Sequence, residues 1–183
     1  MAERDPITAR PRAIAPREIV VVAHNLRSAY NVGALLRTAE VFAVEQVYFA
    51  GFTPYPVEPG DTRDPELQER LTKRIGKTAL GTEHTMRFAH APDVHALLRE
   101  LDHSGYRVTG LEMHPDSVDL RDYEPPRKTA LLLGEEVKGI SAELLAQCSA
   151  VVQVPMYGLK DSLNVSVATG IALYALRAAA TTG

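Results

Sequence analysis

The sequence predicts an α/β domain with a mostly parallel β-sheet flanked by helices. From residue 18 onward, short apolar runs alternate with longer stretches of helical periodicity, and this alternation is typical of parallel strands joined by crossover helices. The chain has 183 residues, of which 45% are hydrophobic and 23% charged, so one domain can bury a substantial core. We therefore expect a single domain over residues 18–183. Residues 1–17, which contain Pro and several Arg, are expected to form a flexible extension.

Each predicted element follows from a local pattern. Compact apolar runs predict strands over residues 19–23, 47–50, 106–111, 129–133 and 150–154. Helical spacing predicts helices over residues 32–41, 64–76, 92–105 and 164–180, with a further short helix after Ser141. Asn31 is available as the N-cap of the first helix. Asp64 followed by Pro65 starts the second helix, and Gly76 is expected to end it.

The last predicted helix, residues 164–180, has almost no polar face. Its apolar positions are Val165, Val167, Ala168, Ile171, Ala172, Leu173, Ala175 and Leu176. A helix that is apolar nearly all round must be buried on several sides. In a chain of this length the simplest partner for such a helix is a second copy, so the sequence predicts a homodimer.

Composition excludes several classes of protein. Cys148 is the sole cysteine, which rules out an internal disulfide and a cysteine-based zinc cluster and favours a structural thiol. The six histidines show no metal-binding spacing, so we expect no metal. There is no apolar run of the roughly 20 residues that a membrane helix needs, and residues 1–17 lack the apolar core of a signal peptide. A reduced, cytoplasmic setting away from membranes is expected.

Charge is unevenly distributed along the chain. The formal net charge of −3 argues against indiscriminate binding to nucleic acid. Four basic residues, however, form a cluster without acids: Arg70, Lys73, Arg74 and Lys77. This cluster is compatible with a local basic face for RNA and equally with an ordinary solvated helix surface.

Three segments could carry chemistry, because ligands of open α/β sheets gather at the carboxyl ends of strands. One comprises residues 110–112, another residues 134–139, and the third begins at residue 154. Glycines at both ends of 134–139 let the backbone approach a ligand closely, although the loop is neither a Walker motif nor a dinucleotide fingerprint. Arg37 lies on an otherwise apolar helix, where it could serve a site or simply extend into water.

Taken in order, the motifs resemble those of the TrmH (SpoU) branch of the SPOUT superfamily of RNA methyltransferases. The first reads Asn25-x-x-Ser28 with Asn31-Val32-Gly33-x-x-x-Arg37-Thr38-Ala39. The second reads Leu133-Gly134-x-Glu136-x-x-Gly139-Ile140-Ser141. The third reads Val154-Pro155-Met156-x-Gly158-x-x-x-Ser162-Leu163-Asn164-Val165-Ser166-Val167. Each motif is modestly specific, but the ordered set, which spans residues 25–167, is strong.

The resemblance implies a C-terminal trefoil knot and S-adenosylmethionine as cofactor. By matching positions, the cofactor is expected to contact Leu111, Gly134, Val154, Met156, Ser162 and Leu163. The residues expected to be catalytic are Arg37, Asn31, Glu136, Ser162 and Asn164. The family works as a dimer, which agrees with the apolar last helix. The implied reaction is transfer of a methyl group to a ribose 2′-hydroxyl of tRNA or rRNA.

A mechanism consistent with this resemblance gives Arg37 a phosphate-binding role. A guanidinium does not readily lose its proton, so we expect Arg37 to grip the adjacent phosphate and stabilise the developing alkoxide rather than act as a base. Asn31 would orient Arg37 or the ribose, and Glu136 would fix its loop by accepting backbone N–H bonds. Residues 77–83 could help to select the RNA or form an ordinary turn.

Two other hypotheses come from different classes of protein. One is a non-catalytic module that binds S-adenosylmethionine or RNA without methylating; the presence of both Arg37 and Asn164 speaks against such a decayed site. The other is a flavodoxin-like nucleotide-binding protein, which fits the alternation of strands and helices but explains none of the three motifs.

Overall fold

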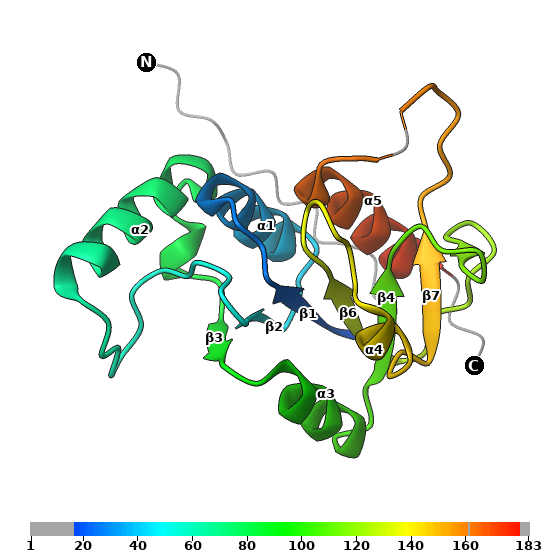
Figure 1. Cartoon of the computed structure of the whole chain (residues 1–183), viewed down its shortest axis with the longest axis horizontal. Coiled ribbons are helices and arrows are strands. Elements are labelled where there is room, and N and C mark those ends of the chain that lie inside the picture. Colours follow the sequence, from blue (N-terminus) through cyan, green and yellow to red (C-terminus); the bar gives the residue numbers. More distant parts are fainter. Residues whose placement is uncertain (1–16, 161, 180–183) are drawn as a thin grey trace, which may run out of the picture.

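The computed structural model describes residues 17–160 and 162–179, and it confirms a parallel α/β sheet flanked by helices (Figure 1). The sheet has seven strands in the order β3-β2-β1-β6-β4-β7-β5, and every neighbouring pair is parallel. The strands are β1 (Glu18–His24), β2 (Gln46–Ala50), β3 (Phe88–Ala91), β4 (Arg107–Leu111), β5 (Val118–Asp119), β6 (Lys128–Leu133) and β7 (Ala150–Gln153). The helices are α1 (Ala29–Val41), α2 (Pro65–Ala79), α3 (Val94–His103), α4 (Ala142–Leu145) and α5 (Val165–Ala178), with a 3-10 turn at Thr82–His84.

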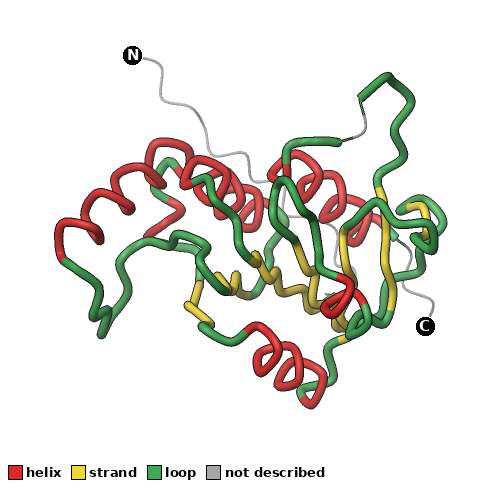
Figure 2. The backbone as a smooth tube through the Cα atoms, in the orientation of Figure 1, coloured by secondary structure: helices red, strands yellow, loops and turns green. Residues whose placement is uncertain are grey.

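The two faces of the sheet bury two separate cores. Alternate side chains of β1 point to opposite faces, so Ile19 and Val21 enter one core and Val20 and Val22 the other. The first core lies under α1, α2 and α5, and the second lies under α3 and α4. Figure 2 shows the resulting three layers, with helices above and below the strands. Burial on both faces explains why the central strands read as continuous apolar runs.

The beginning of α1 differs from the prediction. Ser28, not Asn31, is the N-cap, and its hydroxyl accepts the Asn31 backbone N–H at 3.3 Å. The helix therefore starts at Ala29, three residues earlier than expected. Both residue types are good N-caps, so the local pattern could not choose between them. The choice of Ser28 leaves the side chain of Asn31 available for other contacts.

The end of α2 is also later than predicted. Gly76 lies inside the helix, which continues to Ala79 and ends where Leu80 adopts a left-handed conformation with φ of 53°. The glycine does not end the helix, and it lies close to the Glu83 carboxylate, which a Cβ at this position would approach to 2.7 Å. By contrast, Asp64 caps the start of α2, and Ser141 and Asn164 cap α4 and α5.

Two edge strands, β3 and β5, were missing from the sequence prediction. All four residues of β3 are only half-buried, and β5 has two residues. An edge strand makes one ladder of hydrogen bonds and buries little side-chain area, so it needs no long apolar run. Their absence from the prediction did not change the fold class.

Helix α5 packs along α1 and buries Thr169, Ala172, Leu173 and Leu176. Arg177 fixes its C-terminal end, because its guanidinium donates to the carbonyls of Phe42, Ala43 and Arg17. Of the predicted extension, residues 1–16 lie outside the described residues, whereas Arg17 is buried and donates to the carbonyl of Pro125. No helix in the described part of the chain is long and apolar enough to cross a bilayer.

Candidate active site

A cavity of about 390 Å³ lies at the carboxyl ends of three adjacent strands, β6, β4 and β7. Its walls come from residues 111–113 and 133–139 and from seven residues of the third motif and its flanks, namely Gln153, Val154, Met156, Ser162, Leu163, Val165 and Ala168. All six residues predicted to contact the cofactor line it: Leu111, Gly134, Val154, Met156, Ser162 and Leu163. A cavity of this size at the strand ends of an α/β sheet is typical of a small-molecule site.

The loop from Gly134 to Gly139 is closed by its own backbone. Glu135 and Gly139 exchange two hydrogen bonds of 3.1 and 2.8 Å. A Cβ at Gly134 would come within 2.3 Å of the Gly139 backbone, so the loop can close this tightly only with glycine at that position. Gly139 has a φ of +68°, which also favours glycine. The cavity wall here is therefore bare backbone.

Glu112 holds the same loop from the end of β4, and the sequence did not predict it as a site residue. Its Oε2 accepts the Ile140 backbone N–H at 2.8 Å, and its Oε1 accepts the N–H of Met113 at 3.0 Å. A Cβ on Gly139 would lie 2.1 Å from Oε2. A single acid after a strand looks like any surface acid in the sequence, so only the fold reveals this contact.

Three of the predicted catalytic residues meet in one chain of hydrogen bonds. The Asn164 amide donates to Asn31 Oδ1 at 3.0 Å, and the Asn31 amide donates to Glu136 Oε1 at 3.1 Å. Asn164 Oδ1 meanwhile accepts the Ser166 N–H at 2.9 Å and so caps α5. Each of the three sequence motifs supplies one member of this chain. Segments more than 100 residues apart are thereby joined at the rim of the cavity.

Glu136 is an ionised acceptor for the turn that precedes α1. Its carboxylate accepts backbone N–H bonds from Arg27 at 3.0 Å and Ser28 at 3.3 Å. Partial burial would raise the pKa of Glu136, but the bonds from Arg27, Ser28 and Asn31 outweigh it and hold the pKa below its ordinary value. The carboxylate thus accepts backbone N–H bonds as predicted, and the partners lie in the first motif.

Next to it, Glu135 forms an ion pair with the side chain of Arg27. The Glu135 side chain is 9% exposed and lies in the cavity wall, whereas that of Arg27 is 59% exposed. Arg27 therefore contacts the loop twice, through its backbone with Glu136 and through its guanidinium with Glu135. This pair could not be predicted from the sequence, because Arg27 and Glu135 occupy variable positions of their motifs.

Arg37 does not join the cavity within one chain. It is exposed on α1 and lines a separate groove with Thr38, Lys77 and Thr78. Within the described residues its side chain makes no hydrogen bond or ion pair. Ser162, by contrast, lies in the cavity wall as expected.

The described residues contain no group of three or more His, Cys, Asp or Glu side chains that could hold a metal ion. Cys148 is partly buried and its Sγ donates to the Leu144 carbonyl at 3.4 Å. Burial raises the pKa of its thiol to about 11, so the thiol remains protonated at neutral pH. These properties are those of a structural thiol, as the sequence predicted.

The sequence is similar to those of known RNA methyltransferases. The model of the SpoU rRNA Methylase family matches residues 18–174. The tRNA (guanosine(18)-2'-O)-methyltransferase of Aquifex aeolicus is 29% identical over 160 residues, which cover 86% of this chain and 68% of the relative. The enzyme of the same name from Thermus thermophilus is also 29% identical, with 86% of this chain and 73% of the relative covered.

Solved structures agree with this placement. The AdoMet-bound rRNA methyltransferase from Sinorhizobium meliloti matches with a TM-score of 0.72 and 26% identity over 87% of this chain. The match spans only 56% of that longer protein. The A. aeolicus TrmH/SpoU tRNA modifying enzyme matches with a TM-score of 0.66 and 24% identity, covering 88% of this chain and 74% of that structure.

Proposed function

Because this chain belongs to the SpoU rRNA methylase family, we propose that it transfers a methyl group from S-adenosylmethionine to a ribose 2′-hydroxyl of tRNA or rRNA. The observation that carries the proposal is the hydrogen-bonded chain Asn164–Asn31–Glu136. It unites the three motifs at the rim of a cavity whose size suits a small cofactor. Relatives that cover most of this chain are named as tRNA 2′-O-methyltransferases.

The cavity fits S-adenosylmethionine chemically. Apolar side chains of Leu111, Val154, Met156 and Leu163 offer a surface for an adenine ring, and the bare backbone around Gly134 offers polar groups. The carboxylate of Glu135 lies in the same wall, where its charge is paired with Arg27. When bound, the cofactor supplies an electrophilic methyl group on its sulfonium. The neighbour from S. meliloti was solved with AdoMet bound.

Activation of the 2′-hydroxyl is assigned to Arg37 together with the motif residues. A guanidinium binds phosphate through a planar fork and stabilises a developing alkoxide without giving up its proton. Asn31 orients the ribose or Arg37, and Ser162 and Asn164 hold the third motif against the cavity. The proton leaves to the adjacent phosphate or to water. Alignment of oxygen, carbon and sulfur can contribute several kcal/mol, up to about 7–11 kcal/mol in ideal systems.

The position of Arg37 outside the cavity makes a second subunit part of this proposal. Helix α5 exposes a stripe of three apolar residues, Val167, Ile171 and Tyr174, even after it has packed on α1. A homodimer through α5 covers this stripe and brings Arg37 of one copy near the cavity of the other. The site would then be complete only in the dimer.

The finer details of the fold and setting are also proposals. The family membership implies a trefoil knot in the C-terminal part. Its support is the sheet order, in which β6 lies between β1 and β4, while the chain after β7 returns to pack α5 against α1. Work on tRNA or rRNA suits a cytoplasmic protein.

Methyl transfer can be tested directly with full-length protein, labelled S-adenosylmethionine and total RNA from cells that lack this gene. We expect label in RNA and a 2′-O-methyl nucleoside after digestion. Arg37→Ala is expected to reduce kcat by about 100-fold or more, and Arg37→Lys, which keeps the charge but loses the fork, by nearly as much. Arg99→Ala, on exposed α3, is the matched control and retains full activity.

The non-catalytic alternative has one observation in its favour, namely that Arg37 lies apart from the cavity of its own chain. It predicts that the protein binds S-adenosylmethionine in calorimetry yet incorporates no label into any RNA. If Arg37→Lys instead turns over at a near-normal rate, the protein is a methyltransferase, but the planar fork of Arg37 is not needed for the reaction.

A further inference from the structure

The basic cluster on α2 forms one continuous stripe. Arg70, Lys73, Arg74 and Lys77 are spaced i, i+3, i+4 and i+7 in a regular helix, so they share a face, and all four are exposed. Helix α2 lies at one end of the molecule, beyond α1 (Figure 1). In a chain of net charge −3, such a concentration of positive charge marks a surface that attracts an anionic partner.

An aromatic groove adjoins this stripe. Arg27, Phe52, Tyr55, Arg74 and His90 are among the residues that line it, and we call it the β2–α2 groove. The Phe52 side chain is 57% exposed, whereas phenylalanine side chains are usually buried. Nearby, the guanidinium of Arg74 lies 5.7 Å from the ring centroid of Tyr30, itself 42% exposed. Aromatic faces and cations thus lie side by side.

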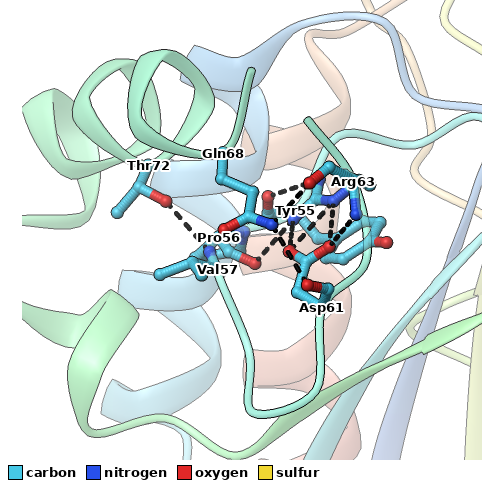
Figure 3. Close-up of polar contacts among 7 residues, drawn as sticks. All are labelled: Tyr55, Pro56, Val57, Asp61, Arg63, Gln68 and Thr72. Atoms are coloured by element: carbon cyan, nitrogen blue, oxygen red, sulfur yellow. Dashed lines mark hydrogen bonds and ion pairs between the residues drawn. The ribbon is translucent and has the colours of Figure 1, made fainter. Parts of the chain in front are cut away.

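One wall of the β2–α2 groove is held in a fixed shape (Figure 3). The Arg63 guanidinium lies 3.4 Å from the Tyr55 ring centroid and donates to the Asp61 carboxylate and to the carbonyls of Tyr55 and Pro56. His90 stacks on Tyr55 at 4.4 Å. Because Arg63 and His90 are both so close to the ring centroid, they must occupy opposite faces of the ring. The positive charge of Arg63 is therefore paired with Asp61 and the Tyr55 ring within this loop.

Helix α2 anchors the rest of this wall. Gln68 donates to the carbonyls of Asp61 and Arg63 at 3.2 and 2.8 Å, and the Thr72 hydroxyl accepts the Val57 N–H at 2.9 Å. The loop between β2 and α2 is thus fixed before any partner binds, which lowers the entropic cost of binding.

Arg27 links the β2–α2 groove to the proposed active site. The Arg27 side chain lines the groove and pairs with Glu135 of the cavity wall, while its backbone N–H donates to Glu136. The groove is therefore close to the rim of the cavity.

We propose that the β2–α2 groove binds the single-stranded segment of RNA next to the methylated nucleotide, an inference that rests on the proposed function. A base of this segment stacks on Phe52, and its phosphates lie along Arg74 and the basic stripe of α2. Single-stranded RNA is typically held by such pairs of exposed aromatic faces and flanking cations, whereas duplex RNA offers no free base to stack.

The test combines steady-state kinetics with direct binding, using full-length protein. The substrate is total RNA from cells that lack this gene, and the binding probe is a labelled single-stranded oligoribonucleotide of mixed sequence. For Phe52→Ala with Arg74→Ala we expect KM for RNA and the oligonucleotide Kd to rise about tenfold or more, with kcat and S-adenosylmethionine affinity unchanged. Arg74→Ala alone should reduce the salt dependence of binding by about one counterion. Phe52→Tyr keeps a stacking face and should restore binding.

Arg99→Ala, on the opposite face of the sheet, is the matched control for charge and leaves every value unchanged. An unaltered KM and Kd in the double variant overturns the inference. So does a duplex of the same sequence that competes with the single-stranded probe equally well. In both cases methylation by the wild type still stands. If the wild type methylates no RNA but the double variant loses oligonucleotide binding, the proposed function fails and the groove assignment survives.

Discussion

Because Ser28 caps α1, the side chain of Asn31 is available to the proposed site. Ser28 satisfies the first turn of α1, so the Asn31 amide can bridge Glu136 on one side and Asn164 on the other. Each amide group is used once as donor, and Asn31 also accepts through its oxygen. These hydrogen bonds join the first turn of α1, the loop after β6 and the N-terminus of α5, and none of the three side chains is fully buried. Three of the five proposed catalytic residues are thus positioned by hydrogen bonds at the surface.

Glu136→Gln tests the charge at the centre of this network. The folded pKa of Glu136 lies below its ordinary value of 4.5, so its contribution to stability is fully present above pH 4.5 and disappears as pH falls through the folded pKa. Because the carboxylate is largely exposed, we expect a loss of only about 1 kcal/mol at pH 7. Urea unfolding from pH 7 to pH 3 should show the wild type and the variant converging. A difference that stays constant over this range would contradict the assignment.

Asn164 has two roles that different substitutions can separate. Asn164→Asp keeps an oxygen to cap α5 but loses the amide donor to Asn31, whereas Asn164→Ala loses both. We expect Asn164→Ala to destabilise the protein by about 1 kcal/mol and Asn164→Asp to remain close to the wild type. Both variants should lose methylation activity to a similar degree. Full activity in Asn164→Asp would mean that the bond to Asn31 is dispensable.

At the scale of elements, the cavity is built from loops that depend on glycine and on a partly buried contact from Glu112. The loop after β6 closes on itself, and Glu112 from β4 holds it by its backbone. The cavity wall at the two glycines is therefore main chain, whereas apolar side chains such as those of Leu111 and Leu163 line other parts of it. The shape of this part of the wall depends on Gly134, Gly139 and the Glu112 carboxylate.

Gly139→Ala tests this dependence. The added Cβ meets the Glu112 carboxylate at 2.1 Å and the backbone has a φ of +68°, so we expect a loss of about 2 kcal/mol or more and weaker S-adenosylmethionine binding. Gly60→Ala is the matched control, because its φ is +82° but nothing lies within 4 Å of its Cβ. It should cost only the backbone strain, about 1 kcal/mol, and leave cofactor affinity unchanged. Equal effects in both variants would show that the contact with Glu112 is unimportant.

Much of this could be predicted from local pattern, and the errors have physical causes. The central strands were evident because both faces are buried, whereas β3 and β5 lie at the edges and leave little apolar signal. Gly76 was mistaken for a stop because glycine is common just after helices, whereas α2 in fact ends at Leu80, a residue type that seldom adopts the left-handed conformation. The positions of Arg27 and Glu112 depend on which loops meet, and no local rule gives that. Motifs therefore located the site, and the fold supplied its contacts.

At the scale of the whole molecule, one face of α5 is covered by its own chain and another is not. The remaining stripe includes Ile171, 40% exposed, and Tyr174, 66% exposed. Burying such a stripe against a second copy would gain apolar contact area and bring a second α1, with its Arg37, close by. The oligomeric state and the activity should therefore change together.

Ile171→Asp is the corresponding test. An unpaired carboxylate in a buried interface is expected to weaken the dimer about 100-fold or more. Light scattering at micromolar concentration should show a monomer, and methylation should fall while S-adenosylmethionine still binds. Val118→Asp, an equivalent change on exposed β5, should stay dimeric and active. A wild-type protein that is monomeric under these conditions would contradict the dimer.

The position of β6 between β1 and β4 has a consequence for biosynthesis. Glu18 in β1 pairs with Lys128 in β6, and Asn31 bonds to Asn164, 133 residues further along. A nascent chain emerging from the ribosome must leave this edge of β1 unpaired until β6, which begins at Lys128, has been made. The pocket cannot close before the last helix emerges. Such long-range pairing predicts slow folding and a need for protection of the early strands while translation continues.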